Sequence, residues 1–512
     1  MKRTVLTIIW MTVALMSFAQ TEDEFAKFVN SRRQEYKEYI DKQNQEFISF
    51  LKEYWTEYPT EKPVKCPRKP EPLKPVLFDK AKQPAMPSQI IVDGVITMPP
   101  PLINPVKVGK PEKVLNIQIP KPELMPDQAP KVSVAPPENL LPNEPEPVPE
   151  QNTKEWVIVD YYGSTIYINN ALKGCLSLAG IAEKDIARGW ETLCKKNYRL
   201  LISDCKNTKD YFHMCDWGYV LFTGKVAEAL CGSSTSSEKI LMQLFILSQS
   251  GYKAKVARKD DKLVLLIATD GILYGIPYYT LQGEKYFLLY DNSLNDKIFT
   301  YGKNLAKANK KVCMRIMDQQ VMRQILKKRL VQAQAYPVAV ETRINKALID
   351  FYRDYPQCEF YVYAGAPVSD EIEETVLPAL EDAVKGKDKV EAANILLNFV
   401  QTAFQYQTDQ QQFGYEKPFF IDEIFYYPYS DCEDRAILYQ FLVRRLLKLE
   451  VVLVDYPEHL ATAVHFPMDV KGDFVMVGDK KYIVCDPTFI NASIGCAMPQ
   501  YKGAKVKVMK AE

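Results

Sequence analysis

The distribution of proline most constrains what this chain can fold into. Of its 34 prolines, 23 lie between Pro59 and Pro149. Proline fixes φ and lacks a backbone N–H, so this segment cannot form a long helix or a central strand. We therefore predict an extended, semi-rigid proline-rich spacer at residues 58–152. Within it, Ile90–Ile96 has the composition of a strand that pairs with a neighbour. A proline-binding partner is the alternative use of such a segment.

The start of the chain has the pattern of a secretory signal peptide. Lys2 and Arg3 form a charged start, Val5–Met16 is apolar, and Ser17–Ala19 offers a cleavage site. The apolar stretch is short for a membrane span and has no second charged flank. We predict a signal peptide at residues 1–19 and an exported protein, periplasmic or secreted, with no integral membrane segment after cleavage. An uncleaved anchor is the alternative.

Residues 20–57 have the pattern of an amphipathic helix. Apolar residues recur at spacings of three, four and seven, at Phe25, Val29, Tyr36, Tyr39, Ile40, Phe47, Phe50, Leu51 and Tyr54. The helix either docks on its own protein or self-associates, and its mixed charges argue against a membrane surface. The whole chain has 65 basic and 64 acidic residues, which gives no indication of nucleic-acid binding.

Beyond Trp156 the pattern is that of two α+β units, residues 153–310 and 311–512. In the first unit we predict a hairpin at 157–168, helices at 177–196, 216–230 and 237–250, and strands at 252–258, 263–268, 274–279 and 286–291. In the second we predict helices at 348–355, 376–384, 392–406 and 435–449, with a strand at 359–364. Helices that precede a set of antiparallel strands are typical of the α+β class.

A cysteine at the start of a helix is the main candidate for chemistry. Cys432 follows Ser430 and Asp431, both good N-cap residues, and precedes the helical run 435–449. A thiol in the first turn faces unpaired N–H groups and the positive end of the helix dipole, which stabilise a thiolate. Asp431, Glu433 and Asp434 oppose thiolate formation by their charge, so a histidine partner is needed. A structural thiol is the alternative.

Two of the three histidines follow Cys432 closely. His459 and His465 share one face of an alternating segment but lie too far apart along a strand for both to reach the thiol. His459 begins that strand after a loop, so we favour it as the base. Asp486 ends the strand 481–485 before Pro487, where it can accept a hydrogen bond from the imidazole. A simple Asp-Pro turn is the alternative for Asp486.

The first α+β unit has features of a degenerate copy of the second. The apolar spacing of Ile240–Phe245 agrees with that of Ile437–Leu442. In that alignment Thr235 takes the place of Cys432, and the strands that follow contain no histidine. Duplication of one unit accounts for the pattern, and so do two unrelated units that share the same order of helices and strands. In either case the middle unit lacks a catalytic triad.

The segments Asp431–Ala436, His459–Val464 and Asp486–Thr488, in this order and spacing, resemble exported bacterial members of the transglutaminase-like superfamily of papain-type folds. The resemblance implies that 311–512 is a transglutaminase-like catalytic domain, in which a helix carrying Cys432 packs on an antiparallel sheet carrying His459 and Asp486. It also implies acyl transfer through a thioester and a side-chain donor for the oxyanion. Gln405 is the candidate donor, with Tyr429 as the alternative.

These features predict an exported thiol enzyme that hydrolyses peptide or side-chain amide bonds of a protein substrate. Transfer to an amine, which would crosslink proteins, is an alternative. A non-catalytic interaction protein displayed on the proline-rich spacer is another. None of the eleven cysteines forms a CxxC pair, so we predict neither a metal nor another cofactor. Their odd number leaves at least one thiol free unless two chains pair, and the disulfide pattern stays open.

Overall fold

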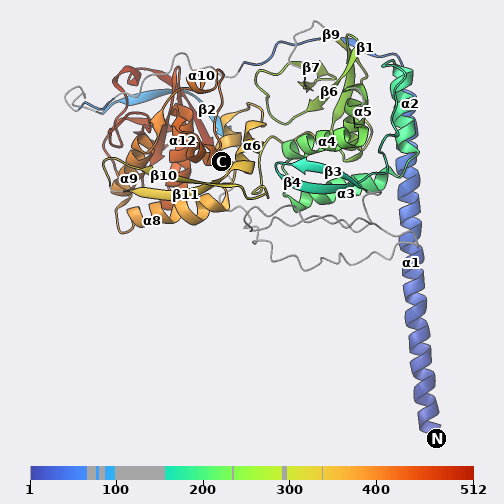
Figure 1. Cartoon of the computed structure of the whole chain (residues 1–512). Coiled ribbons are helices and arrows are strands. Elements are labelled where there is room, and N and C mark those ends of the chain that lie inside the picture. The colour runs from blue at the N-terminus through green and yellow to red at the C-terminus, as the bar shows by residue number, and fades with distance from the viewer. Residues whose placement is uncertain are drawn as a thin grey trace.

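In a computed structural model, the chain forms two mixed α+β domains and a long N-terminal helix that projects from them (Figure 1). The structure describes residues 2–65, 77–79, 87–98, 156–232, 236–290, 297–336 and 338–511, with the side chains of all of these except 2–26, 236 and 511. Thr235, Cys66 and residues 99–152 of the predicted spacer therefore lie outside the described residues. The mixed helix and strand content agrees with the predicted α+β class.

The projecting helix is α1, Lys2–Leu51, and it includes the predicted signal peptide. No proline or glycine interrupts it. Its last turns lie against the middle domain (Figure 1), where Ile40, Phe47 and Leu51 are buried. Phe28 and Tyr36, nearer the start of the helix, are exposed. Among the described residues, no helix has both the length and the apolar character that a membrane crossing requires.

The middle domain begins with a β-hairpin and contains four helices and a six-stranded sheet. The hairpin is β3, Trp156–Tyr161, with β4, Ser164–Asn169, and the helices are α2, Glu183–Cys194, α3, Tyr198–Tyr211, α4, Asp216–Cys231, and α5, Ser236–Gln249. The sheet has the order β1-β9-β5-β6-β8-β7. Its strands are β1, Thr56–Pro59, β5, Ala254–Lys259, β6, Lys262–Ala268, β7, Tyr278–Leu281, β8, Glu284–Leu289, and β9, Lys297–Thr300. Helix α5 covers one face of this sheet, as its apolar sequence requires.

The C-terminal domain surrounds one buried helix with a closed barrel on one side and helices on the other. Its first part comprises β10, Leu326–Gln332, β11, Ala339–Asn345, α6, Lys346–Arg353, α7, Phe360–Ala364, the π-helix η2, Ile372–Val376, α8, Leu377–Val384, and α9, Lys389–Thr402. Then come β12, Gln405–Tyr406, α10, Asp409–Gln412, α11, Ile421–Tyr426, β13, Tyr429–Ser430, the central helix α12, Cys432–Leu442, and the π-helix η3, Val443–Leu447.

The barrel has the strand order β14-β15-β17-β16-β2-β18. Its strands are β2, Gln89–Met98, β14, Glu450–Tyr456, β15, His459–His465, β16, Phe474–Val477, β17, Lys480–Cys485, and β18, Lys505–Ala511; the short helix η4, Pro499–Tyr501, precedes β18. Helix α12 packs between β15 and α9, so its whole circumference is buried. A buried helix of this kind has a continuous rather than a periodic apolar sequence.

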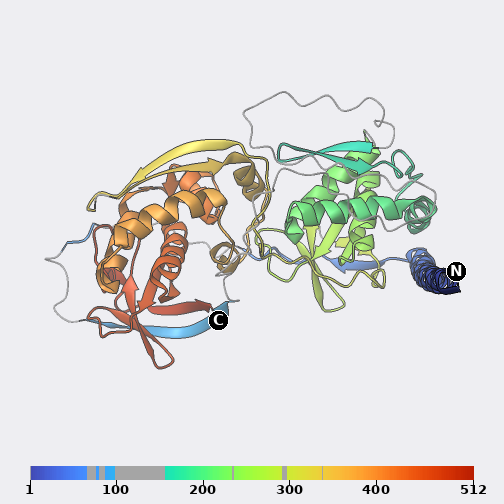
Figure 2. The same ribbon diagram turned by 90° about the horizontal axis from the view of Figure 1, so that it is seen from below.

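The first part of the predicted spacer is not a spacer, because it supplies strands to both domains. Strand β1 forms the edge of the middle sheet, and β2 lies in parallel between β16 and β18 of the barrel (Figures 1 and 2). Proline explains these boundaries. Pro59 ends an edge strand, and β2 occupies a stretch without proline between Pro87 and Pro99. The strand that we predicted at Ile90–Ile96 is thus the central part of β2.

The two domains repeat one topology. In each, a β-hairpin is followed by helices, then by a helix that covers the sheet, and then by five strands. The first two of these strands form a hairpin, the fourth lies between the second and the third, and the fifth pairs with the first. A strand from the N-terminal segment then joins the fifth strand in both domains. This repetition favours duplication over two unrelated units.

The strand register locates the middle-domain counterparts of two predicted site residues. The hairpins β5–β6 and β14–β15 have the same two-residue loops, which puts Lys262 at the position of His459. Three residues after these positions, Leu265 pairs with Leu289 and Thr462 pairs with Cys485. The residues that follow, Tyr290 and Asp486, are therefore counterparts. Neither lysine nor tyrosine at these positions reproduces a histidine–carboxylate pair.

Candidate functional site

The predicted nucleophile, Cys432, is the first residue of α12, and Asp431 is the N-cap. Burial of α12 between a sheet and a helix leaves Cys432 only 6% exposed. Its Sγ donates a hydrogen bond to Glu433 Oε2 at 2.9 Å. The thiol therefore lies at a helix N-terminus, as the sequence predicted, and contacts one of the acids that oppose its ionisation.

His459 and Asp486 are in direct contact. His459 Nε2 lies 2.8 Å from Asp486 Oδ2, and both side chains are 2% exposed. Strands β15 and β17 pair at Thr462 and Cys485, so the loop after β17 passes beside the start of β15. The other carboxylate oxygen, Oδ1, accepts from the N–H groups of Thr488 and Phe489 at 2.9 and 3.2 Å. Asp486 is therefore both a turn-forming residue and the partner of His459, and the ring nitrogen Nδ1 remains for another contact.

Two tyrosines hold the imidazole of His459. The ring of Tyr501 stacks on it with centroids 5.3 Å apart and an angle of 11°, and Tyr456 lies 6.0 Å away at 22°. Burial raises the pKa of Tyr501, and the nearby charges of Cys432 and Asp486 raise it further. Tyr501 in η4 is therefore close to Cys432, His459 and Asp486, the three predicted site residues.

The oxyanion candidate Gln405 lies next to its alternative. Strand β12 pairs in parallel with β13, which places Gln405 opposite Tyr429 and Tyr406 opposite Ser430. Gln405 itself is exposed, whereas Tyr406 is half-buried. Burial is the main reason that the pKa of Tyr406 is raised, and the charge of Cys432 is the next. Tyr406, which the sequence did not single out, is thus the residue of β12 that approaches the thiol.

Two further buried side chains position the site, and both were missed. Arg435, 1% exposed, donates to Ser430 Oγ and to the carbonyls of Gln401 and Phe404 at 2.8 to 3.2 Å. The side-chain amide of Gln401 donates to the carbonyl of Asp486 and to two later carbonyls of the same loop. Such contacts cross from helix to loop and leave no local spacing pattern. The only sequence signal for Arg435 was a charged residue in the first turn of a largely apolar helix.

The other histidine of this domain and its other cysteines have different surroundings. His465 Nδ1 lies 2.9 Å from the carbonyl oxygen of Lys481, at the opposite end of β15 from Asp486. The structure describes ten cysteines, and no disulfide joins any two of them, Cys485 and Cys496 included. Cys432 is therefore not joined to either of its neighbours in a disulfide.

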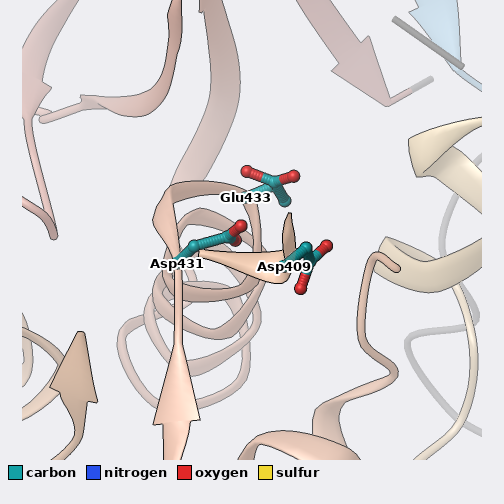
Figure 3. Close-up of side chains that lie close together, drawn as sticks. All are labelled: Asp409, Asp431 and Glu433. Carbon is teal, nitrogen blue, oxygen red and sulfur yellow. The ribbon is translucent and has the colours of Figure 1, made fainter. Parts of the chain in front are cut away.

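A group of acids lies beside the thiol. Asp409 in α10, the N-cap Asp431 and Glu433 in α12 bring one carboxylate oxygen each within 4.8 Å of one another (Figure 3). All three side chains are buried. Among the described residues, this group has the oxygen ligands that a cation would require.

No protein-family model matches this chain, and neither a curated protein nor a solved structure is significantly similar to it.

Proposed function

We propose that this chain is an exported enzyme of the transglutaminase-like type, which hydrolyses peptide or side-chain amide bonds through a thioester on Cys432. His459 acts as the base and Asp486 orients it. The contact between His459 Nε2 and Asp486 Oδ2 is the observation that carries the proposal, because it joins two residues chosen for these roles from the sequence. A buried imidazole with a carboxylate behind it is the arrangement that activates a nucleophile.

In the first step, His459 Nδ1 takes the proton of Cys432 Sγ, and the thiolate attacks the carbonyl carbon of the amide. A C–S bond forms, and the carbonyl electrons move to the oxygen. The N–H groups at the start of α12 and the hydroxyl of Tyr406 are the donors available for this oxyanion. When the carbonyl re-forms, the C–N bond breaks, and the imidazolium gives its proton to the leaving amine.

In the second step, His459 takes a proton from water as the oxygen attacks the thioester carbon. The C–S bond breaks, the acid product leaves, and the proton returns to Cys432. The carboxylate of Asp486 accepts from Nε2–H throughout, which keeps Nδ1 available and stabilises the imidazolium. The thiol must first rotate away from Glu433 before it can give its proton to His459.

The same Cys432–Glu433 contact favours a second candidate, a non-catalytic interaction protein. A thiol that donates to a neighbouring carboxylate is a satisfied structural group. The middle domain, with Lys262 and Tyr290 at the key positions, offers a precedent within the chain for this fold without a triad.

Labelling with an electrophilic thiol probe distinguishes these candidates. The rate of labelling at Cys432, followed by mass spectrometry of peptides, is compared in wild type and in His459→Ala. His465→Ala is the matched control, because His465 lies on the same strand and contacts a carbonyl rather than Asp486. An enzyme is expected to lose at least about tenfold in rate in His459→Ala alone. Equal rates in all three proteins would contradict the proposed base.

Hydrolysis and crosslinking are distinguished by the acceptor. With a peptide substrate and a labelled primary amine, a hydrolase yields the free acid, whereas an amine-acceptor enzyme incorporates the label. Cys432→Ala is the control for both products.

A further inference from the structure

The positive charge near the acids beside Cys432 is too small to balance their negative charge. Asp409, Asp431 and Glu433 are buried within 4.8 Å of one another. Two buried cations of this region donate their side-chain hydrogen bonds to other groups. Lys417 Nζ contacts Glu423 Oε1 at 2.5 Å, and Arg435 donates to a hydroxyl and two carbonyls. Buried carboxylates so close together repel one another unless a cation or a shared proton joins them.

Backbone groups satisfy some of these oxygens. Asp409 Oδ2 accepts from the N–H of Lys417 at 2.5 Å. The neighbouring Asp434 accepts from the N–H groups of Phe419 and Asp431 at 2.9 and 3.1 Å, which fixes the start of α12. Asp434 is thus a structural cap, and Asp409, Asp431 and Glu433 gather beside the start of α12 (Figure 3).

One oxygen in this group has no partner. Asp431 is 5% exposed, and its Oδ1 is buried without a hydrogen bond. The side chain points from the N-cap position into the space between Glu433 and Asp409 (Figure 3). A buried carboxylate oxygen without a partner is costly and rare in native proteins, so its direction indicates where a ligand binds.

We propose that Asp409, Asp431 and Glu433 bind a hard divalent cation of the Ca²⁺ or Mg²⁺ class. Three carboxylate oxygens, with no imidazole among them, are the donor set that such ions prefer. The cation balances the buried charge and supplies the missing partner of Asp431 Oδ1. Sequence spacing could not predict this site, because Asp409 comes from α10 and the other two ligands from the start of α12.

Cation binding has a consequence for the thiol, which rests on the proposed function. Glu433 Oε2 accepts the Cys432 hydrogen bond in this structure. A cation held by Glu433 competes for that oxygen. The cation therefore favours release of the thiol toward His459.

Calorimetric titration of the full-length, chelator-treated protein with CaCl₂ or MgCl₂ tests the site. We expect one cation per chain, and at least about tenfold weaker binding in Asp409→Asn and Glu433→Gln, because each removes a ligand charge. Asp422→Asn is the matched control, since Asp422 is an equally buried acid outside the group. It is expected to bind the cation as wild type does.

The proposal is overturned if wild type shows no saturable binding at millimolar cation, or if both folded ligand variants bind as tightly as the control. Binding of ZnCl₂ alone, lost in Cys432→Ser, would also overturn it by indicating a thiolate site. Circular dichroism establishes that each variant is folded, and the wild-type titration decides the matter if both variants unfold. Because binding is read without any reaction at Cys432, failure of this proposal is distinguishable from failure of the proposed enzyme.

Discussion

At the scale of single residues, Asp486 combines two roles that substitutions can separate. Asp486→Asn keeps an Oδ1 acceptor for the N–H groups of Thr488 and Phe489 but presents an amide to His459 Nε2. We expect labelling of Cys432 to slow by at least about tenfold while stability changes little. Asp486→Ala removes both roles and should also lower the free energy of unfolding by about 1–3 kcal/mol in urea. A normal labelling rate in Asp486→Asn would exclude the orienting role.

The burial of Asp422 leads to a prediction about how the stability of the fold depends on pH. Burial raises the pKa of this carboxyl from 3.8 to about 7, and its Oδ2 accepts from the N–H of Ser369. Between about pH 4 and 7 the folded state thus binds more protons than the unfolded state, so its stability falls as the pH rises. Each pH unit in this window costs up to about 1.4 kcal/mol. The difference in unfolding free energy between wild type and Asp422→Asn should follow this slope, and a difference independent of pH would contradict it.

The candidate site was predictable from sequence only where its chemistry coincides with a local signal. Cys432 has N-cap residues before it, His459 begins a strand, and Asp486 precedes a proline, so each could be named. The register of β12 with β13 decides instead that Tyr406 rather than Gln405 approaches the thiol. Register and contacts such as those of Arg435 depend on the tertiary fold, which no single segment encodes.

At the scale of elements, helix α7 shows tertiary packing overriding propensity. The segment 359–364 was predicted as a strand because aromatic and β-branched residues favour strands. It forms a helix instead, with Tyr363 packed on Phe420 and with Phe360 and Tyr361 against the cluster that contains Cys432. The missed helix α3 has the same cause, since its neighbours rather than its local periodicity decide it. The helix predicted at 435–449 is α12 followed directly by the π-helix η3, which ends at Leu447.

Arg435 connects elements, and its removal should be costly. It joins the start of α12 to the end of α9 and to the residues before β12. Arg435→Met keeps much of the volume but leaves two carbonyls and the Ser430 hydroxyl unpaired. We expect the free energy of unfolding to fall by about 3 kcal/mol, measured by urea denaturation. The control is Arg188→Met on the exposed face of α2, and equal effects of the two changes would disprove this bridging role.

At the scale of the whole molecule, the two-domain α+β organisation and much of the order of its elements were predictable, because helices and strands there have their own periodicities. The paths of β1 and β2 were not, since a proline-rich composition describes what a segment cannot do rather than where its short strands pair. For the same reason the sequence did not predict the closed barrel. Its neighbouring strands β2 and β18 are the first and the last of its strands in chain order.

The barrel therefore predicts strand complementation. Residues 311–512 expressed alone lack β2 and leave the edges of β16 and β18 unpaired. We expect this fragment to be poorly folded or aggregated, and a peptide of residues 87–98 to restore a monomer with a higher melting temperature. Size-exclusion chromatography and circular dichroism measure both effects, with a scrambled peptide as the control. A fragment equally stable without the peptide would show that β2 is dispensable.

The position of β2 also orders events during synthesis. The N–H of Ser88, beside β2, bonds to Asp473, 385 residues later, and β18 follows all the other barrel strands in chain order. A ribosome adds roughly 5–20 residues each second, so β2 exists for tens of seconds before its partners do. The barrel can close only after β18 has been translated, and the site of Cys432 is completed with it. A nascent chain that still lacks β18 would thus carry no assembled thiol site.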